Sequence, residues 1–395
     1  MRFLFTFAGG GGHFDPLGPI ARAAEHAGHA VACGCQPGMM PVVQAAGFAA
    51  FDTGGDTLGG PERRPLLELD PEREDEALRE GFARRTAGDR AGRILSLCAV
   101  WKPDLIVCDE VDLGAVVAAE RFGVSHATVS VIAAGSFVRP ELVAGPLNEL
   151  RAEFGLPPDP GMRMLSRYLV LAPLPPSYRD PAFPLPATAH PIRPVMPDPA
   201  VAAVPPPWKA VRPGAPTVYF ALGTIFNLES GDLFDRVIAG LAQLPVNLVV
   251  TVGRDIDPAE FGPQPEHVHI QRYLPQPLVL PHCQLVVSHG GSGSVIGALA
   301  HGVPMVLIPM GADQPHNAAR CRQLGVARVL DAIRLTPDTA RDAASAVLVD
   351  PSYRRAAERL RDEAAALPGP AHAVDLLERL ATQRRPLPSV PDTQS

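Results

Sequence analysis

A glycine-rich stretch in the second half of the chain carries polar groups suited to holding an anion. Residues 289–294 read His-Gly-Gly-Ser-Gly-Ser, between an apolar run at 285–287 and a helical pattern at 293–301. A strand, a glycine-rich turn and a helix N-terminus in this order present unpaired backbone N–H groups and the positive end of the helix to an anion. The glycines allow a phosphate to approach the backbone closely. His289, Ser292 and Ser294 add side-chain donors, so the pattern predicts a phosphate-binding turn.

An imidazole and a carboxylate follow two expected strands in the first half of the chain. His13 comes after an apolar run at 2–8 and four glycines, and Asp109 ends the apolar run at 105–108. Because α/β proteins bind ligands at the carboxyl ends of their parallel strands, we expect the two side chains to lie close together. A carboxylate beside an imidazole fixes its tautomer and raises its basicity, so the pair can deprotonate a hydroxyl. Asp112 is an alternative partner for His13.

The helices and strands that must position these groups alternate along the chain. In the first half we expect strands at 2–8, 29–35 and 105–108, with helices at 16–27 and 41–46. In the second half we expect strands at 217–221, 248–252, 267–271, 285–287 and 305–309, with helices at 232–243 and 293–301. This alternation predicts an α/β protein with right-handed crossovers and two doubly wound parallel sheets.

The length of 395 residues suggests two domains, and a proline-dense stretch from 171 to 216 separates them. Such a stretch is expected to be an extended spacer. The expected organisation is an N-terminal domain at 1–204, a proline-rich linker at 205–216, a second domain at 217–370, a final helix at 371–383 and a flexible tail at 384–395.

Composition argues against several classes of protein. A net charge of −7 without a basic patch does not favour nucleic-acid binding. The apolar start is too short for a signal peptide or a membrane span. The six cysteines form no CxxC pair, which is typical of reduced cysteines in a cytoplasmic protein without a metal site. The glycines at 9–12 do not make a dinucleotide fingerprint, because Phe14 occupies the position of the third glycine and no acidic residue ends the strand at 29–35.

The stretch at 286–319 resembles the donor-binding signature of nucleotide-sugar-dependent glycosyltransferases with two Rossmann-like domains (GT-B fold, family 1 type). More narrowly, it is similar to actinobacterial enzymes that glycosylate antibiotics and other natural products. The matching positions are His289, Gly291, Ser294, Gly302, Pro304, Pro309, Asp313, Gln314, Asn317 and Ala318. The turn from Gly12 to Pro16 resembles the turn that carries the family's catalytic base. The resemblance therefore implies two domains facing across a cleft, with His13 as the base and Asp109 as its partner.

The resemblance also implies roles for other residues. The nucleotide-sugar site would comprise Thr224, Tyr273, Leu274, Gln276, His289, Gly290, Gly291, Ser292, Gly293, Ser294, Asp313 and Gln314. Variable helices and loops of the N-terminal domain would shape the acceptor pocket, with Gly12, Phe14, Phe82 and Phe137 as candidates. Many family members place Glu eight residues after the signature histidine to hold both ribose hydroxyls, and Gly297 stands there instead. This departure favours thymidine diphosphate (dTDP) sugars and leaves uridine diphosphate (UDP) sugars as an alternative.

The implied reaction is an inverting transfer of a sugar, expected to be a deoxysugar, to a hydroxyl of a hydrophobic aglycone. No cofactor or metal is expected, and the small-molecule acceptor and the nucleotide sugar are the expected partners. A sugar-nucleotide epimerase, a nucleotide-sugar-binding auxiliary protein and a pure binding module remain alternatives. The identity of the sugar and acceptor, the attack by carbon or nitrogen in place of oxygen, and a homodimeric state are left open.

Overall fold

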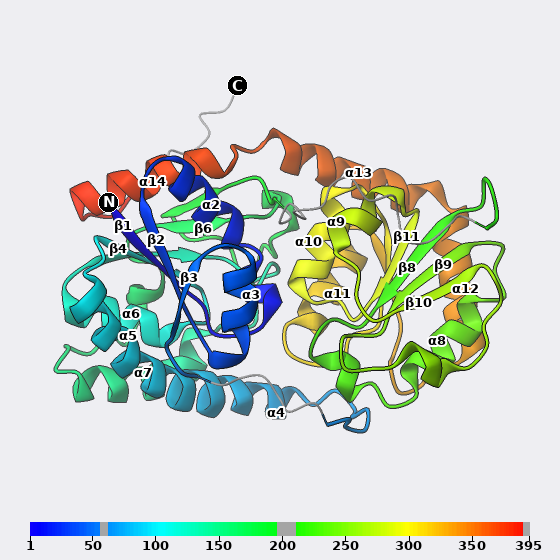
Figure 1. The fold of residues 1–395 in the computed structure, drawn as a ribbon, viewed down its shortest axis with the longest axis horizontal. Coiled ribbons are helices and arrows are strands. Elements are labelled where there is room, and N and C mark those ends of the chain that lie inside the picture. Colours follow the sequence, from blue (N-terminus) through cyan, green and yellow to red (C-terminus); the bar gives the residue numbers. More distant parts are fainter. Residues whose placement is uncertain (56–61, 196–210, 390–395) are drawn as a thin grey trace.

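The computed structural model describes residues 1–55, 62–195 and 211–389, and it contains two parallel sheets in two α/β domains (Figure 1). This agrees with the fold class predicted from the sequence. Part of the predicted linker at 205–216 and the end of the predicted tail lie outside the described residues.

The first sheet contains seven parallel strands in the order β3-β2-β1-β4-β5-β6-β7. Their bounds are β1 Arg2–Thr6, β2 Ala30–Cys35, β3 Ala49–Asp52, β4 Leu105–Asp109, β5 Ser125–Val129, β6 Val170–Ala172 and β7 Ala189–Pro191. The central strands β1 and β4 are almost wholly buried, which explains their uninterrupted apolar sequences.

The helices of the first domain include one long continuous helical run, from Pro71 to Trp101. Their bounds are α1 Gly11–Phe14, α2 Gly18–His26, α3 Met40–Ala45, α4 Pro71–Glu76, α5 Ala87–Trp101, α6 Leu113–Phe122 and α7 Pro140–Glu153. A π-helical segment, Ala77–Thr86, joins α4 to α5. The carboxylate of Asp70 accepts hydrogen bonds from the N–H groups of Glu72 and Arg73, which explains why α4 begins at Pro71.

The second sheet contains six parallel strands in the order β10-β9-β8-β11-β12-β13. The strands are β8 Thr217–Ala221, β9 Asn247–Thr251, β10 Val268–Gln271, β11 Leu285–Ser288, β12 Met305–Leu307 and β13 Ala327–Val329. The helices are α8 Leu233–Leu241, α9 Gln276–Val279, α10 Ser292–Ala300, α11 Gln314–Gln323, α12 Pro337–Val349, α13 Pro351–Ala366 and α14 Pro370–Gln383.

Each sheet has a switch point where the strand order reverses, between β1 and β4 in the first domain and between β8 and β11 in the second. Ligands of open α/β sheets bind in the crevice at the carboxyl ends of such strands. His13 follows β1 and Asp109 ends β4, whereas Thr224 follows β8 and His289 follows β11. Both candidate sites therefore lie at switch points.

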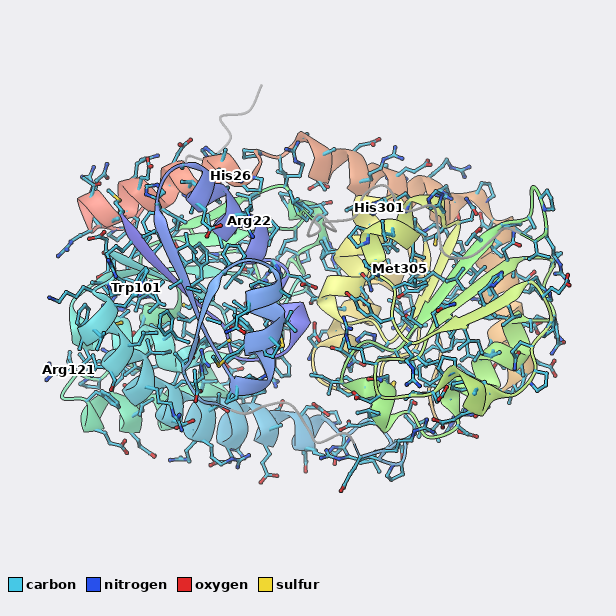
Figure 2. All side chains as sticks on the ribbon, viewed as in Figure 1. Arg22, His26, Trp101, Arg121, His301 and Met305 are labelled. Carbon is cyan, nitrogen blue, oxygen red and sulfur yellow. The ribbon has the colours of Figure 1, made fainter. Side chains whose placement is uncertain are left out.

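Several segments join the two domains. Figure 1 shows α10 and α11 on the side of the second domain that faces the first, and α13 and α14 running along one edge of the molecule back to the first domain. In Figure 2, Trp101 and Arg121 lie on the outer side of the first domain, whereas His301 and Met305 lie in the second. Helix α14 packs against α2, β4 and β5. In the opposite direction, Leu66 from the segment before α4 packs against the core of the second domain.

The proline-dense stretch is not the continuous spacer that the sequence predicted. It contains β6 and β7, which extend the first sheet, and Tyr178 from this stretch is buried against the second domain. Proline is tolerated in β7 because this strand lies at the sheet edge, where one side of the backbone needs no strand partner. The sequence pattern also did not predict strands β3, β5 and β13.

Within the described ranges, no helix combines the length and the hydropathy that crossing a bilayer requires.

Candidate active site

The side chains of His13 and Asp109 form a hydrogen-bonded pair at the switch point of the first sheet. The Nδ1 atom of His13 lies 3.1 Å from Oδ2 of Asp109. An ionised carboxylate only accepts hydrogen bonds, so Nδ1 carries the proton and Nε2 has a free lone pair. The Asp109 side chain is fully buried, whereas 23% of the His13 side chain is exposed. The pair therefore has an accessible basic nitrogen and a fixed, buried partner.

Backbone N–H groups hold the Asp109 carboxylate in place. Oδ2 accepts a hydrogen bond from the N–H of Ala8 at 3.0 Å. Oδ1 accepts from the N–H groups of Val111 and Asp112, each at 2.7 Å. All four hydrogen bonds, including that from His13, converge on one buried side chain. The orientation of the imidazole is consequently determined by the turn after β4.

Gly9, which the sequence did not single out, contacts the imidazole of His13. A Cβ atom built on Gly9 would lie 2.2 Å from Cδ2 of His13, so the imidazole packs directly over the glycine backbone. A side chain at position 9 would displace the imidazole of His13. The signal was present in the glycine run before His13, but the run alone does not show which glycine contacts the ring.

The surroundings of His13 increase its basicity. Burial lowers the pKa of the imidazole, but the hydrogen bond and charge of Asp109, with smaller effects from Asp313 and Glu110, raise it above 6.5. Asp313 belongs to the second domain. The electrostatic environment of His13 therefore includes a carboxylate from the second domain.

Asp112, the alternative partner of His13, is occupied elsewhere. Its two carboxylate oxygens accept hydrogen bonds from Nε and one terminal nitrogen of Arg90, at 2.8 and 2.6 Å. Both side chains are fully buried. The Asp112 carboxylate also accepts from the N–H of Ala115 and caps α6. The contacts of Arg90, a residue that the sequence did not single out, therefore assign Asp112 to a structural ion pair and leave Asp109 as the partner of His13.

The predicted phosphate-binding turn lies at the switch point of the second sheet, where α10 begins at Ser292. Gly293 and Ser294 are in the first turn of this helix, whose N–H groups have no partners within the helix. Gly293 is exposed and Ser294 is partly exposed. Together with the positive helix end, these groups form an anion-binding geometry.

His289 contributes a neutral imidazole to the turn. The residue is 8% exposed, and burial lowers the pKa of its imidazole to about 4, so the ring is uncharged near neutral pH. The buried Nδ1 atom has no hydrogen-bond partner among the described residues. A buried polar atom without a partner is costly. His289 is therefore suited to donate one hydrogen bond rather than to provide a positive charge.

Gly223, in the turn after β8, packs against the other side of His289. Its φ is +77°, and an added Cβ would lie 2.7 Å from Cε1 of His289. Both the backbone conformation and the close contact require glycine. The following Thr224 is exposed, so its hydroxyl is accessible beside this turn.

The Ser292 hydroxyl is already fully used, which the sequence did not anticipate. It donates to Oδ2 of Asp313 at 2.6 Å and accepts from the amide of Asn317 at 3.0 Å and from the N–H of Ala133 at 2.9 Å. Oδ2 of Asp313 also accepts from Asn317 at 2.7 Å. Within the phosphate-binding turn, Ser294 rather than Ser292 therefore has a hydroxyl available for an anion.

Gln314 is almost completely buried, and its carbonyl oxygen accepts hydrogen bonds from the N–H groups of Met310 and Gly311. Only its amide nitrogen remains to contact a ligand. Ala312, two residues earlier in the loop, has a positive φ of 51° and donates its N–H to Glu74 of α4 at 2.9 Å. The loop before α11 is thus ordered from both domains.

The predicted nucleobase segment has one accessible aromatic ring. Tyr273 is 46% exposed and the guanidinium of Arg254 lies 4.0 Å from the centre of its ring. Both residues line an open pocket of about 550 Å³ with Pro258 and residues 271–272. Leu274 is buried in the core and Nε2 of Gln276 is 3.5 Å from Oγ of Ser294. Gln276 therefore reaches the phosphate-binding turn, whereas the side chain of Leu274 packs in the core of the second domain.

The three aromatic candidates for acceptor binding belong to the first domain's core. Phe14 packs against Phe7 and Phe48, and Phe137 is also buried. Phe82 is partly buried against the same core. The sequence could not distinguish these core rings from pocket rings, because helical spacing is similar for both. Gly12 is exposed and an added Cβ would contact nothing, so this position next to His13 is open.

No group of three or more His, Cys, Asp or Glu side chains in the described part of the chain is arranged to hold a metal ion. All six cysteines are buried and reduced.

Comparisons with known proteins extend over both domains. Residues 235–380 match the family described as Erythromycin biosynthesis protein CIII-like, C-terminal domain. The chain is 28% identical over 431 residues to 10-deoxymethynolide desosaminyltransferase of Streptomyces venezuelae, with 98% of this chain and 99% of the relative covered. It is also 28% identical over 436 residues to TDP-daunosamine transferase DnrS of Streptomyces peucetius, with 98% of each chain covered.

A solved structure gives the same result at the level of the fold. The glycosyltransferase SsfS6 of Streptomyces sp. SF2575, complexed with thymidine diphosphate, matches with a TM-score of 0.75 and 25% sequence identity. The match covers 96% of this chain and 99% of that chain. With the family match and the full-length relatives, it identifies the chain as a glycosyltransferase of the GT-B fold, related to the antibiotic glycosyltransferases of actinobacteria and carrying an EryCIII-like C-terminal domain.

Proposed function

We propose that this protein transfers a deoxysugar from a dTDP-sugar to a hydroxyl of a hydrophobic natural product, with inversion at the anomeric carbon. The observation that carries the proposal is the hydrogen-bonded pair of His13 and Asp109, and the charge of Asp313 in the second domain also raises the pKa of His13. This arrangement combines a proton acceptor from one domain with a donor-binding loop from the other.

The proton transfer begins with the acceptor hydroxyl beside His13. Nε2 of His13 takes the hydroxyl proton, and Asp109 stabilises the imidazolium that forms. The acceptor oxygen then attacks the anomeric carbon from the face opposite the nucleotide. The bond between that carbon and the diphosphate oxygen breaks, and the electron pair leaves with the diphosphate. A single displacement of this kind inverts the anomeric centre.

The leaving diphosphate would lie against the turn at 289–294. The N–H groups of Gly293 and Ser294, the Ser294 hydroxyl and the neutral His289 are oriented before the reaction begins. Preorganised donors of this kind stabilise developing charge without further reorganisation. Asp313 is suited to accept a hydrogen bond from a sugar hydroxyl, because Oδ1 is not used in its contacts with Ser292 and Asn317.

Two observations favour a thymidine nucleotide and a deoxysugar. Gly297 in α10 provides no carboxylate for a second ribose hydroxyl. The relatives named above are described as desosaminyl and daunosamine transferases, and SsfS6 was solved with thymidine diphosphate. Tyr273, beside Arg254, is the accessible aromatic group suited to contact the thymine base.

The test is acceptor-dependent release of dTDP. The purified protein is incubated with a panel of dTDP-deoxysugars, including amino sugars, and a panel of polyketide aglycones, and the products are detected by mass. The wild type should form an aglycone–sugar product together with dTDP, whereas His13→Ala should form little of either. Conversion of the dTDP-sugar without any acceptor would indicate an epimerase instead. Equal product formation by His13→Ala would contradict the role of the base.

A further inference from the structure

The loop after β5, residues 131–134, is held at its first end by Glu110. The N–H groups of Val131 and Ile132 both donate to Oε1 of Glu110, each at 2.6 Å. Arg179 donates to the carbonyl oxygen of Ile132 at 3.2 Å. Because Glu110 directly follows Asp109, one strand end fixes both the partner of the base and this loop.

The second end of the loop binds the other domain. The N–H of Ala133 donates to Oγ of Ser292, and the N–H of Ala134 donates to Oδ1 of Asn317 at 3.3 Å. Ser292 and Asn317 in turn contact Oδ2 of Asp313. The loop therefore connects the strand end beside the base to the start of α10 and to the carboxylate that influences His13.

The four loop residues are buried, with Ile132 the most exposed at 7%. Every N–H group from 131 to 134 is satisfied by a side chain rather than by a strand or helix partner. The first two N–H groups donate to Glu110 in the first domain, and the next two donate to Ser292 and Asn317 in the second. The loop is therefore a short connection, held at both ends, between the two halves of the site.

We propose that Glu110 is a positioning residue, which holds loop 131–134 so that Ala133 and Ala134 dock on Ser292 and Asn317. The docking sets the position of the phosphate-binding turn relative to the pair of His13 and Asp109. The catalytic consequence rests on the glycosyl transfer proposed above. The docking itself is a property of the fold and is tested separately.

Two substitutions at this position separate loss of the hydrogen bonds from loss of the charge. Glu110→Ala removes the acceptor, whereas Glu110→Gln keeps a carbonyl oxygen that accepts both N–H groups. The matched control is Asp159→Ala, because Asp159 is a buried carboxylate that accepts one backbone hydrogen bond, from Met164 at 2.7 Å, within the first domain. All three variants are compared with the wild type by amide hydrogen exchange and by dTDP release.

Glu110→Ala should speed exchange at the amides of Ala133 and Ala134 and slow turnover, each by about tenfold (1.4 kcal/mol) or more, because the N–H groups of Val131 and Ile132 lose their shared acceptor. Its affinity for dTDP should be unchanged, because the nucleotide contacts lie in the second domain. Glu110→Gln should restore both properties, and Asp159→Ala should change neither of them.

Unchanged exchange at Ala133 and Ala134 in Glu110→Ala would overturn the proposal. So would a Glu110→Gln variant as impaired as Glu110→Ala, because the two N–H groups would then not depend on an acceptor oxygen. A wild-type protein that turns over no dTDP-sugar would contradict the proposed function, while the exchange measurement would still decide whether Glu110 positions the loop.

Discussion

Replacing Asp109 by asparagine changes one atom of the site, and the structure predicts which one. Oδ1 accepts the two shorter backbone hydrogen bonds, from Val111 and Asp112, so the asparagine oxygen should remain there. The new NH₂ group then takes the place of Oδ2, facing Ala8 and His13. It can donate to Nδ1 of His13 and thereby force the proton onto Nε2. The nitrogen that must accept the substrate proton would no longer be free.

The expected loss of activity follows from the proposed role of His13 as a general base. Positioned acid–base groups contribute about 10²–10⁴-fold to rates, so kcat should fall by a factor in this range. The N–H of Ala8 would also face another donor, and leaving a buried N–H unpaired costs about 1–3 kcal/mol of stability. His13→Ala should lose as much activity but less stability, because it removes a partly exposed side chain and leaves only one acceptor site of Asp109 empty.

Initial rates of dTDP release measured for the wild type, both single variants and the double variant test this reasoning. Residues that act as one unit are not additive, so the double variant should be no slower than His13→Ala alone. Chemical denaturation gives the change in the free energy of unfolding for the same four proteins. Turnover of Asp109→Asn close to that of the wild type would refute the argument, as would fully additive effects on kcat.

The remaining predictions concern pH and the buried ion pair. Because His13 must be neutral to accept a proton, kcat/KM should fall as the pH drops through its raised pKa, above 6.5, and a limb centred below 6.5 would contradict the assigned environment. The same raised pKa gives the opposite trend in stability: protonated His13 stabilises the fold fully below pH 6.5, and this contribution is lost as the pH rises through the folded-state pKa. Arg90→Ala should lower the free energy of unfolding by about 3–5 kcal/mol, because it leaves the Asp112 carboxylate buried and unpaired, and an unchanged denaturation midpoint would exclude this pair as a stabilising element.

The sequence was most informative where local pattern and tertiary structure agree. The apolar run at 217–221 became β8 with the same bounds, because a parallel strand buried on both faces needs only apolar residues. The turn at 289–294 and the pair of His13 and Asp109 were predicted from residue type and position after a strand. These features depend on the sheet topology alone, which the alternation of strands and helices indicates.

The sequence was least informative where the two domains meet. Ser292 was expected to bind phosphate, but its hydroxyl is used by Asp313, Asn317 and the N–H of Ala133, a residue about 160 positions away. Phe14 was expected near the acceptor and lies in the core. Each of these outcomes depends on contacts with residues from other elements, so a local sequence pattern does not predict it. The roles of Arg90 and Glu110 are of the same kind, since their partners lie on other elements.

The central claim, a dTDP-sugar site at the switch point of the second sheet, is tested most directly by titrating the protein with dTDP, UDP and NAD and following thermal unfolding. A ligand at about 100 times its Kd adds roughly 2.7 kcal/mol to the stability of the folded state. We expect dTDP to stabilise the wild type more than UDP, NAD to have no effect, and His289→Ala to lose most of the response to dTDP. Stabilisation by UDP alone would contradict the preference inferred from Gly297. A response to NAD and to neither diphosphate would contradict the proposed donor site.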